Sequence, residues 1–258
     1  MILDGWGIAT NPKVSAIDAA KTPFIDSLYQ AYPHSKLEAS GLAVGLPEGQ
    51  MGNSEVGHMN LGAGRVVYQN LVRINKAVQE NTLGQEPELA KAFEYAKSNT
   101  KSVHFIGLVS DGGVHAHIEH LKSLLTTASE AGLKKVFVHA FTDGRDTDPK
   151  SGLNFLTDLY QHTLKTNTQI ATVTGRYFAM DRDNRWERVA LAYNAMVHGT
   201  GDASQDVLAS IAKSYADGVT DEFIKPIIIT GEDQKPLAKI EDGDAVICFN
   251  FRTDRCRE

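Results

Sequence analysis

The sequence predicts an α/β protein with a mostly parallel sheet, and two observations support that prediction. Apolar segments of strand length alternate with longer segments in which apolar residues recur every three or four positions, as in amphipathic helices. Such alternation is typical of βαβ units, whose strands run parallel. Polar and charged residues directly follow several of the apolar segments, which is where open α/β sheets place their functional groups.

The composition is that of an ordinary globular protein. Of the 258 residues, 42% are hydrophobic and 22% are charged, which is enough apolar material for a core. The net charge of −6 argues against nucleic acid or an anionic membrane surface as the main partner. We find no apolar run of membrane-spanning length and no secretory signal pattern. Cys248 and Cys256 lack metal-ligand spacing, which argues against a disulfide framework and favours a cytoplasmic location.

The expected elements follow in chain order. A helix should begin at Pro23 after the N-cap Thr22, followed by a short strand at 36–39 and a helix at 66–78. The periodicity predicts further helices at 88–97, 117–131, 152–165, 185–197 and 203–215, and strands at 103–109, 136–141, 170–173, 226–230 and 245–251.

The glycine-rich segment 45–60 contains one candidate nucleophile, Ser54. Its glycines suit a loop that presents a side chain at a sharp turn or brings backbone amides close to an anion. Asp4 ends a short apolar segment at the start of the chain. A carboxylate and a hydroxyl brought together could share a metal ion, which would make the serine a nucleophile. An ordinary serine in a surface loop, and an aspartate that only forms a turn, are the alternatives.

Polar residues follow four of the predicted strands in the second part of the chain. They are Ser110, Asp111 and His115 after the first strand, Asp143, Arg145 and Asp146 after the second, Thr174 and Arg176 after the third, and Arg252 and Arg255 after the last. The ends of parallel strands meet at one sheet edge, so these residues predict an arginine-rich crevice. Guanidinium groups bind carboxylate or phosphate through paired hydrogen bonds.

Each of these residues also has a plainer interpretation. His115, His117 and His120 could form a solvated helix face, an anion site or a metal cluster. Arg145 and Asp146 could form a surface ion pair of little energetic value. Arg182 lies in a charged turn, and Arg252 and Arg255 could pair with Asp254.

Six motifs occur in a fixed order along nearly the whole chain. They are MILDGWG at 1–7, GQMGNSEVGHMN at 49–60, SDGGVH at 110–115, TDGRDT at 142–147, GRYFAMDR at 175–182 and NFRTDR at 250–255. Together they resemble the cofactor-independent phosphoglycerate mutases. Six motifs in register are far more specific than any one of them.

The resemblance implies two parts with different roles. Residues 1–70 would be the N-terminal segment of an alkaline-phosphatase-like metal-binding domain, and residues 71–258 an inserted α/β transferase domain, with a linker near 69–76. In the family the phosphatase-like domain is discontinuous, and a C-terminal piece supplies the other metal ligands. We therefore expect a truncated chain that lacks the last part of the transferase domain and is inactive alone. Its first 70 residues should expose apolar surface.

The resemblance also implies a reaction, in glycolysis and gluconeogenesis. The family interconverts 3-phosphoglycerate and 2-phosphoglycerate through a phosphoserine intermediate, with two divalent metal ions, typically Mn²⁺, and without 2,3-bisphosphoglycerate. Ser54 would be the nucleophile, and Asp4 and Ser54 would bind metal. The residues implied to hold the substrate are His115, Arg145, Asp146, Arg176, Arg182, Arg252 and Arg255.

Some questions stay open at this stage. The resemblance leads us to expect a monomer. It assigns no role to His58, His117 and His120. Two alternative functions are a different alkaline-phosphatase-like, metal-dependent phosphohydrolase and a non-catalytic fragment that binds phosphoglycerate.

Overall fold

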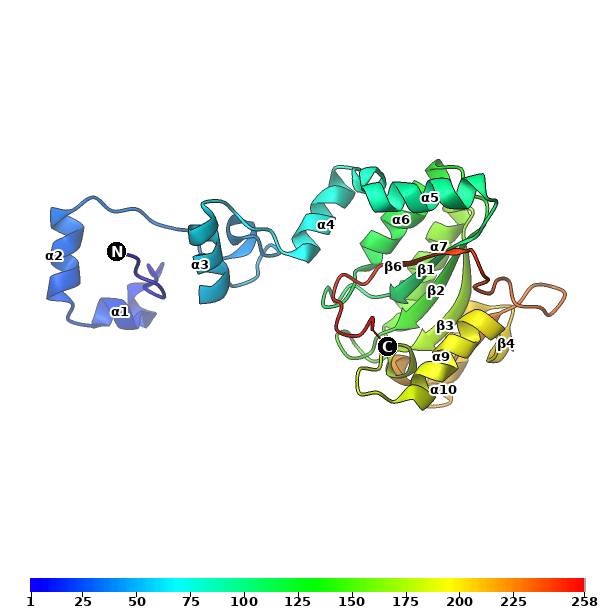
Figure 1. Ribbon diagram of the computed structural model, residues 1–258. Coiled ribbons are helices and arrows are strands. Elements are labelled where there is room, and N and C mark those ends of the chain that lie inside the picture. Colours follow the sequence, from blue (N-terminus) through cyan, green and yellow to red (C-terminus); the bar gives the residue numbers. More distant parts are fainter. Residues whose placement is uncertain (258) are drawn as a thin grey trace. The chain divides into compact units, whose positions relative to one another are not determined.

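The computed structural model describes residues 1–257 and contains two compact units, Met1–Arg73 and Ile74–Glu258 (Figure 1). The division falls within helix α4 (Asn70–Gln79). Among the described residues, no helix combines the length and the apolar character needed to cross a lipid bilayer.

The second unit is built on a six-stranded sheet with the strand order β4-β5-β3-β2-β1-β6 in the described part of the chain. The strands are β1 (Val103–Leu108), β2 (Val136–Thr142), β3 (Gln169–Gly175), β4 (Asp202–Ser204), β5 (Ile227–Ile229) and β6 (Ala245–Cys248). Strands β6, β1, β2 and β3 run parallel, while β5 pairs antiparallel with β3. The predicted mostly parallel sheet is therefore confirmed, and four strands end at the same edge.

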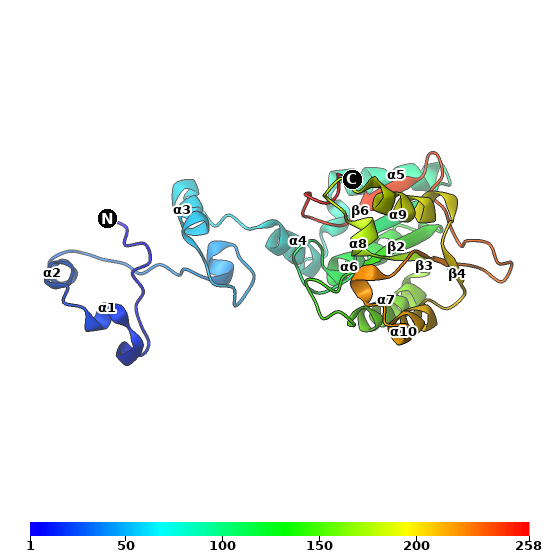
Figure 2. The same ribbon diagram turned by 90° about the horizontal axis from the view of Figure 1, so that it is seen from below.

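Helices cover both faces of this sheet. They are α5 (Pro87–Ser98), α6 (Ile118–Glu130), α7 (Gly152–Thr166), α8 (Arg176–Ala179), α9 (Trp186–His198) and α10 (Val207–Ala216), with 3₁₀ turns η3 (Leu83–Gln85) and η4 (Asp221–Phe223). Figure 2 shows α7 and α10 below the sheet and α8 and α9 on its other side. The core lies between these layers and includes the wholly buried Phe105, Leu121, Leu125, Leu156 and Leu159.

A chain of buried polar side chains crosses the sheet. His104 on β1 has Nε2 3.3 Å from Asp244 Oδ2 and Nδ1 3.0 Å from Nε2 of His139 on β2. Nδ1 of His139 lies 2.9 Å from the Thr172 hydroxyl on β3. An ionised carboxylate only accepts, so every atom is satisfied when Thr172 donates to His139, His139 donates to His104, and His104 donates to Asp244. Both imidazoles are then neutral, with fixed tautomers.

The first unit contains short helices and little core. Its elements are η1 (Pro12–Val14), α1 (Ala16–Ala19), α2 (Pro23–Ala31), η2 (Gly41–Val44) and α3 (Ser54–Ala63). One small buried cluster consists of Val44, Leu46 and Val56. Many other large apolar side chains of this unit are exposed, among them Phe24 (70%) and Leu37 (67%). The expected exposure of apolar surface is thus observed.

Several predicted elements of the first part of the chain need correction. Residues 36–39 form no strand, because they have no partner there and only Ser40 makes an isolated bridge with Met51. The second half of the glycine-rich segment is the helix α3, not a loop, because Asn53 caps its N-terminus. The helix expected at 66–78 begins only at Asn70.

Corrections in the second unit concern element ends. The helix predicted at 203–215 begins at Val207, because Asp206 accepts hydrogen bonds from the backbone N–H groups of Leu208 and Ala209. The residues before it form the short strand β4, whose polar sequence gave no strand signal. Strand β6 ends at Cys248, three residues earlier than predicted.

Candidate active-site residues

Asp4 and Ser54 lie 50 positions apart in the sequence but are in direct contact within the first unit. The Ser54 hydroxyl donates a hydrogen bond of 2.6 Å to Asp4 Oδ2. His58 donates from Nδ1 to the Ser54 carbonyl oxygen at 2.8 Å, and the same nitrogen lies 3.9 Å from Asp4 Oδ2. About half of the Asp4 side chain is exposed, so a substrate or ion can reach this group of residues.

Ser54 is the first residue of helix α3. The Asn53 side chain accepts a hydrogen bond of 3.0 Å from the Val56 N–H, which fixes the start of the helix. The first N–H groups of a helix have no partner within it, and the helix dipole is positive at this end. Negative charge on or near the Ser54 oxygen is therefore stabilised.

Asp4 and Ser54 also offer the type of donor that a hard divalent cation prefers. Carboxylate and hydroxyl oxygens suit Mg²⁺ or Mn²⁺, which take about six ligands. Within residues 1–257, however, no group of three or more His, Cys, Asp or Glu side chains is arranged to hold a metal. The donor chemistry of the pair fits a divalent ion, and these two residues alone would supply only part of its coordination.

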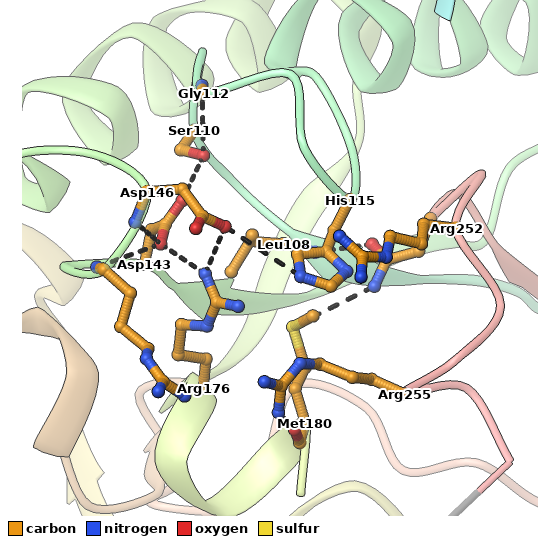
Figure 3. A network of polar contacts seen from close by, with 12 residues as sticks. Leu108, Ser110, Gly112, His115, Asp143, Asp146, Arg176, Met180, Arg252 and Arg255 are labelled. Atoms are coloured by element: carbon orange, nitrogen blue, oxygen red, sulfur yellow. Dashed lines mark hydrogen bonds and ion pairs between the residues drawn. The ribbon is translucent and has the colours of Figure 1, made fainter. Parts of the chain in front are cut away.

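Arg176 is the centre of a buried polar network in the second unit (Figure 3). Its Nη1 donates to Asp143 Oδ1 and to Asp146 Oδ2, each at 2.6 Å. Ser110 donates to the other oxygen of Asp143, also at 2.6 Å. Asp143 follows β2, and Arg176 begins α8 directly after β3, so the adjacent strands bring these side chains together.

The charge state of this network is fixed by its hydrogen bonds. Burial alone would raise the pKa of Asp143, but the hydrogen bonds from Ser110, from the Asp146 backbone and from Arg176 outweigh it and lower that pKa. Burial likewise opposes the charge of Arg176, yet Asp146 and Asp143 raise its pKa overall. Both groups therefore stay ionised.

A second cluster surrounds Asp254. One of its oxygens lies 3.1 Å from Arg252 Nε and 3.6 Å from His115 Nδ1, and the other lies 3.2 Å from Arg182 Nη1. Burial would raise the pKa of Asp254, but Arg252, His115 and Arg182 lower it. Nε2 of His115 lies 3.9 Å from Asp146, so His115 connects this cluster to the Arg176 network.

Arg255 and Arg145 complete the basic region. Nη1 of Arg255 donates to the Met180 carbonyl oxygen at 2.7 Å. Burial lowers the pKa of Arg255, and repulsion from Arg182, Arg176 and Arg145 lowers it further. Arg145 is half exposed, and its Nε lies 3.5 Å from Glu222. Positive charge is thus concentrated at this edge of the sheet.

Some buried nitrogens of this region make no hydrogen bond. They are Nδ1 of His115, Nε of Arg176 and Nε of Arg255, each without a hydrogen bond in the described structure. Burial, followed by repulsion from Arg176, lowers the pKa of His115, so its imidazole is neutral near pH 7.

The other two histidines of the HAHIEH segment have separate structural roles. His117 is the N-cap of α6 and accepts a hydrogen bond of 3.2 Å from the Glu119 N–H. His120 is buried, with Nε2 2.6 Å from Asn75 Oδ1. Burial first, and His117 second, lower the pKa of His120 to about 4. Two interpretations were therefore wrong. The described residues form no metal cluster of His, Cys, Asp or Glu here, and His120 does not lie on a solvated helix face.

The structure therefore connects His115, Asp146, Arg176, Arg182 and Arg252 through close contacts, and links Arg145 and Arg255 to them by charge. Sequence reasoning placed Asp143 in the predicted crevice without a substrate-binding role, and it considered Asp254 only as a partner of Arg252 and Arg255. Their signal was their place directly after strands among basic residues, but the partner of each becomes visible only in three dimensions.

Comparisons with known proteins agree with this fold. The family model described as "BPG-independent PGAM N-terminus" matches residues 74–258, and that of the Metalloenzyme superfamily matches residues 1–143. A Leishmania mexicana phosphoglycerate mutase, whose crystal structure was determined at low cobalt concentration, aligns with a TM-score of 0.74 and 36% identity. That alignment covers 93% of this chain and 46% of the other.

Alignments with two curated relatives cover the whole of this chain but only about half of each relative. The 2,3-bisphosphoglycerate-independent phosphoglycerate mutase of Flavobacterium psychrophilum is 60% identical over 258 residues, which are 100% of this chain and 51% of the relative. That of Parabacteroides distasonis is 55% identical with the same coverage. The chain spans about half the length of these relatives.

Fold and matches place the protein in the α/β class, with an alkaline-phosphatase-like metalloenzyme segment. Within that class, the chain belongs to the family of 2,3-bisphosphoglycerate-independent phosphoglycerate mutases.

Proposed function

We propose that the chain supplies the nucleophile and the substrate-binding residues for the interconversion of 3-phosphoglycerate and 2-phosphoglycerate. The observation behind this proposal is the set of buried nitrogens on His115, Arg176 and Arg255 that make no hydrogen bond. A buried polar group without a hydrogen bond costs about 1 to 3 kcal/mol, so a structure rarely retains three in one region unless a ligand pairs with them. Phosphoglycerate carries a carboxylate and a phosphate, both of which accept hydrogen bonds.

The accessible arginines fit the same ligand. The side chains of Arg182 and Arg252 are 49% and 48% exposed, and both contact the Asp254 carboxylate. Their remaining N–H groups can bind an entering carboxylate or phosphate in paired fashion. The more deeply buried Arg176 is held by Asp143 and Asp146, so it presents its unpaired Nε–H in a fixed direction.

Ser54 is the proposed nucleophile. Asp4 accepts a short hydrogen bond from the Ser54 hydroxyl and so orients the nucleophilic oxygen. The N-terminus of α3 stabilises the negative charge of the phosphoserine that forms there. In this step a bond forms between phosphorus and Ser54 Oγ while the bond to the glycerate oxygen breaks. The glycerate turns, and the phosphoryl group returns to its other hydroxyl.

Divalent metal ions complete this proposal. Asp4 and Ser54 would bind one ion, for which we propose Mn²⁺ because oxygen donors suit it. Such an ion neutralises phosphoryl charge and lowers the pKa of the serine hydroxyl. The reaction requires no 2,3-bisphosphoglycerate, and we propose that the protein acts as a monomer in the cytoplasm.

A chimaeric protein tests this function. Residues 1–258 would be joined to the C-terminal half of the Flavobacterium psychrophilum relative, and conversion of 3-phosphoglycerate would be followed by a coupled enolase assay with Mn²⁺. We expect turnover that Ser54→Ala abolishes and that a chelator removes. Equal turnover by the Ser54→Ala chimaera would contradict the proposed nucleophile.

Measuring the hydrolysis of simple phosphate esters beside this assay separates the alternative functions. A general phosphohydrolase would cleave simple phosphate esters faster than it isomerises phosphoglycerate, whereas we expect the reverse. For residues 1–258 without the added half we predict no turnover, because in the described structure Asp4 and Ser54 supply only part of a metal site. Turnover by that chain alone would show that its own side chains complete the site.

A further inference from the structure

The two cysteines of the chain lie side by side in the second unit, although they are eight positions apart in the sequence. Cys248 is the last residue of β6, and Cys256 lies in the segment that follows. Their Sγ atoms are 3.7 Å apart, and both residues are free and exposed. A disulfide has an S–S distance of about 2.05 Å, so only a small movement separates this contact from a bond.

Local hydrogen bonds hold the pair in this position. The Cys256 N–H donates to the Thr253 carbonyl oxygen at 3.3 Å, which turns the chain back toward the sheet. The Cys256 thiol points at the Arg252 carbonyl oxygen, 3.5 Å away. Cys248 lies on β6, the last strand at one side of the sheet, where a small reagent can reach it.

The geometry gives the two thiols different places in the reaction. Cys248 lies on the exposed edge strand β6, where a small reagent can reach it. Burial first, and the neighbouring Cys248 second, raise the pKa of Cys256 to about 12. The thiolate, rather than the thiol, is the nucleophile, so this shift slows attack by Cys256.

We propose that Cys248 and Cys256 form a reversible intramolecular disulfide when the protein meets a small disulfide oxidant such as oxidised glutathione. The Cys248 thiolate attacks one sulfur of the oxidant, whose S–S bond breaks and releases one glutathione thiolate. Cys256 then attacks Cys248 Sγ and releases the second. The protein loses two protons and two electrons, which the oxidant takes up to become two glutathione thiols.

The disulfide closes a small ring around residues of the basic region. The ring includes Asn250, whose side chain accepts a hydrogen bond of 3.0 Å from the Leu108 N–H, and also Arg252, Asp254 and Arg255. Oxidation therefore ties the segment that bears these arginines to the end of β6. It would restrict their motion without altering any of their side chains.

Mass spectrometry of the whole chain under non-denaturing conditions tests the proposal. After treatment with oxidised glutathione, the mass should fall by two hydrogens, a digest should link the peptides of Cys248 and Cys256, and dithiothreitol should reverse both changes. The single variants Cys248→Ser and Cys256→Ser should each retain one glutathione on the remaining cysteine.

Other outcomes overturn the proposal. Stable glutathione adducts on the unchanged chain, cross-links between two chains, or a chain that stays fully reduced would each do so. Hydrogen exchange provides a separate readout of the ring: backbone amides between the two cysteines should exchange more slowly in the oxidised chain. Equal exchange in both forms would show that the bond does not restrain this segment. None of these measurements depends on phosphoglycerate binding.

Discussion

Arg176 and Asp143 form an ion pair that is almost wholly excluded from water. Nη1 and Oδ1 are 2.6 Å apart, and the two side chains are 3% and 1% exposed. Their proximity follows from strand register: Thr142 on β2 is paired with Gly175 on β3, so the next residue of each strand lies beside the other. The central contact of the basic region is thus set by the parallel sheet.

Removing one member of this pair should strongly destabilise the protein. In Arg176→Met, the buried Asp143 loses its partner, and we expect the free energy of unfolding to fall by about 3 to 5 kcal/mol. Urea denaturation followed by circular dichroism measures this change. The double variant Arg176→Met/Asp143→Asn removes both charges and should recover most of the loss. A double variant as unstable as the single one would show that the charge pair is not the cause.

Asp254 should compete with the proposed substrate for Arg182 and Arg252. Asp254→Asn keeps the shape of the side chain but removes the charge, so both arginines should bind an entering anion more readily. Partly exposed pairs of this kind contribute about 0.5 to 1 kcal/mol, which corresponds to about a two- to fivefold tighter binding of 3-phosphoglycerate. Calorimetric titration checks this expectation, and weaker binding by the variant would mean that Asp254 supports the site instead.

The buried histidine pair should make stability depend on pH. Burial first, and His104 second, lower the pKa of His139 to about 3 from its ordinary value of 6.5, and burial also lowers the pKa of His104 despite Asp244. The unfolded chain then binds more protons than the folded chain below pH 6.5. The neutral histidines therefore contribute fully to the free energy of unfolding above pH 6.5, and this contribution is lost as pH falls toward about 3.

A single substitution isolates this contribution. In His139→Gln, the slope of unfolding free energy against pH should decrease by about 1.4 kcal/mol per pH unit between about pH 4 and pH 5.5, since one titrating group is lost. Urea denaturation at several pH values measures the slope. His198→Gln is the matched control, because this exposed side chain contacts water in both states. An unchanged slope in His139→Gln would contradict the neutral, buried assignment.

Gly175 is required for close packing rather than for an unusual backbone angle. A Cβ at this position would lie 2.4 Å from the Glu222 carbonyl oxygen and 2.7 Å from the Ile224 nitrogen, so η4 would have to move. We expect Gly175→Ala to cost about 1 to 3 kcal/mol of stability. Gly57→Ala in α3, where nothing lies within 4 Å of a Cβ, should cost none. Thermal denaturation of both variants compares them, and equal midpoints would contradict the packing argument.

The strand pattern could be predicted because four of the parallel strands, β1, β2, β3 and β6, consist largely of apolar residues that end at polar ones. That pattern located the candidate residues after β1, β2 and β3. It could not locate β4, whose sequence is polar, or the helix α3, whose Gly57 and Gly62 favoured a loop. The N-cap hydrogen bond that Asn53 accepts from the Val56 N–H stabilises this helix despite the low helix propensity of those glycines.

Some contacts between distant residues could be anticipated and others could not. The sequence suggested that Asp4 and Ser54 come together, and they are in contact. It did not indicate that Asp254 contacts three basic groups or that Cys248 lies against Cys256. These contacts depend on turns whose directions follow from tertiary packing. The motifs nevertheless identified the family, which the comparisons confirmed.

Calorimetric titration of 3-phosphoglycerate into residues 1–258 tests most directly whether the arginines after the sheet bind the substrate. We predict saturable heat that weakens about ten- to hundredfold in affinity in Arg252→Gln, since hydrogen bonds to charged groups contribute about 1.5 to 3 kcal/mol. Arg185→Gln, at an exposed arginine before α9, is the matched control and should bind like the unchanged chain. No heat at millimolar ligand, or equal binding by Arg252→Gln, would contradict the account.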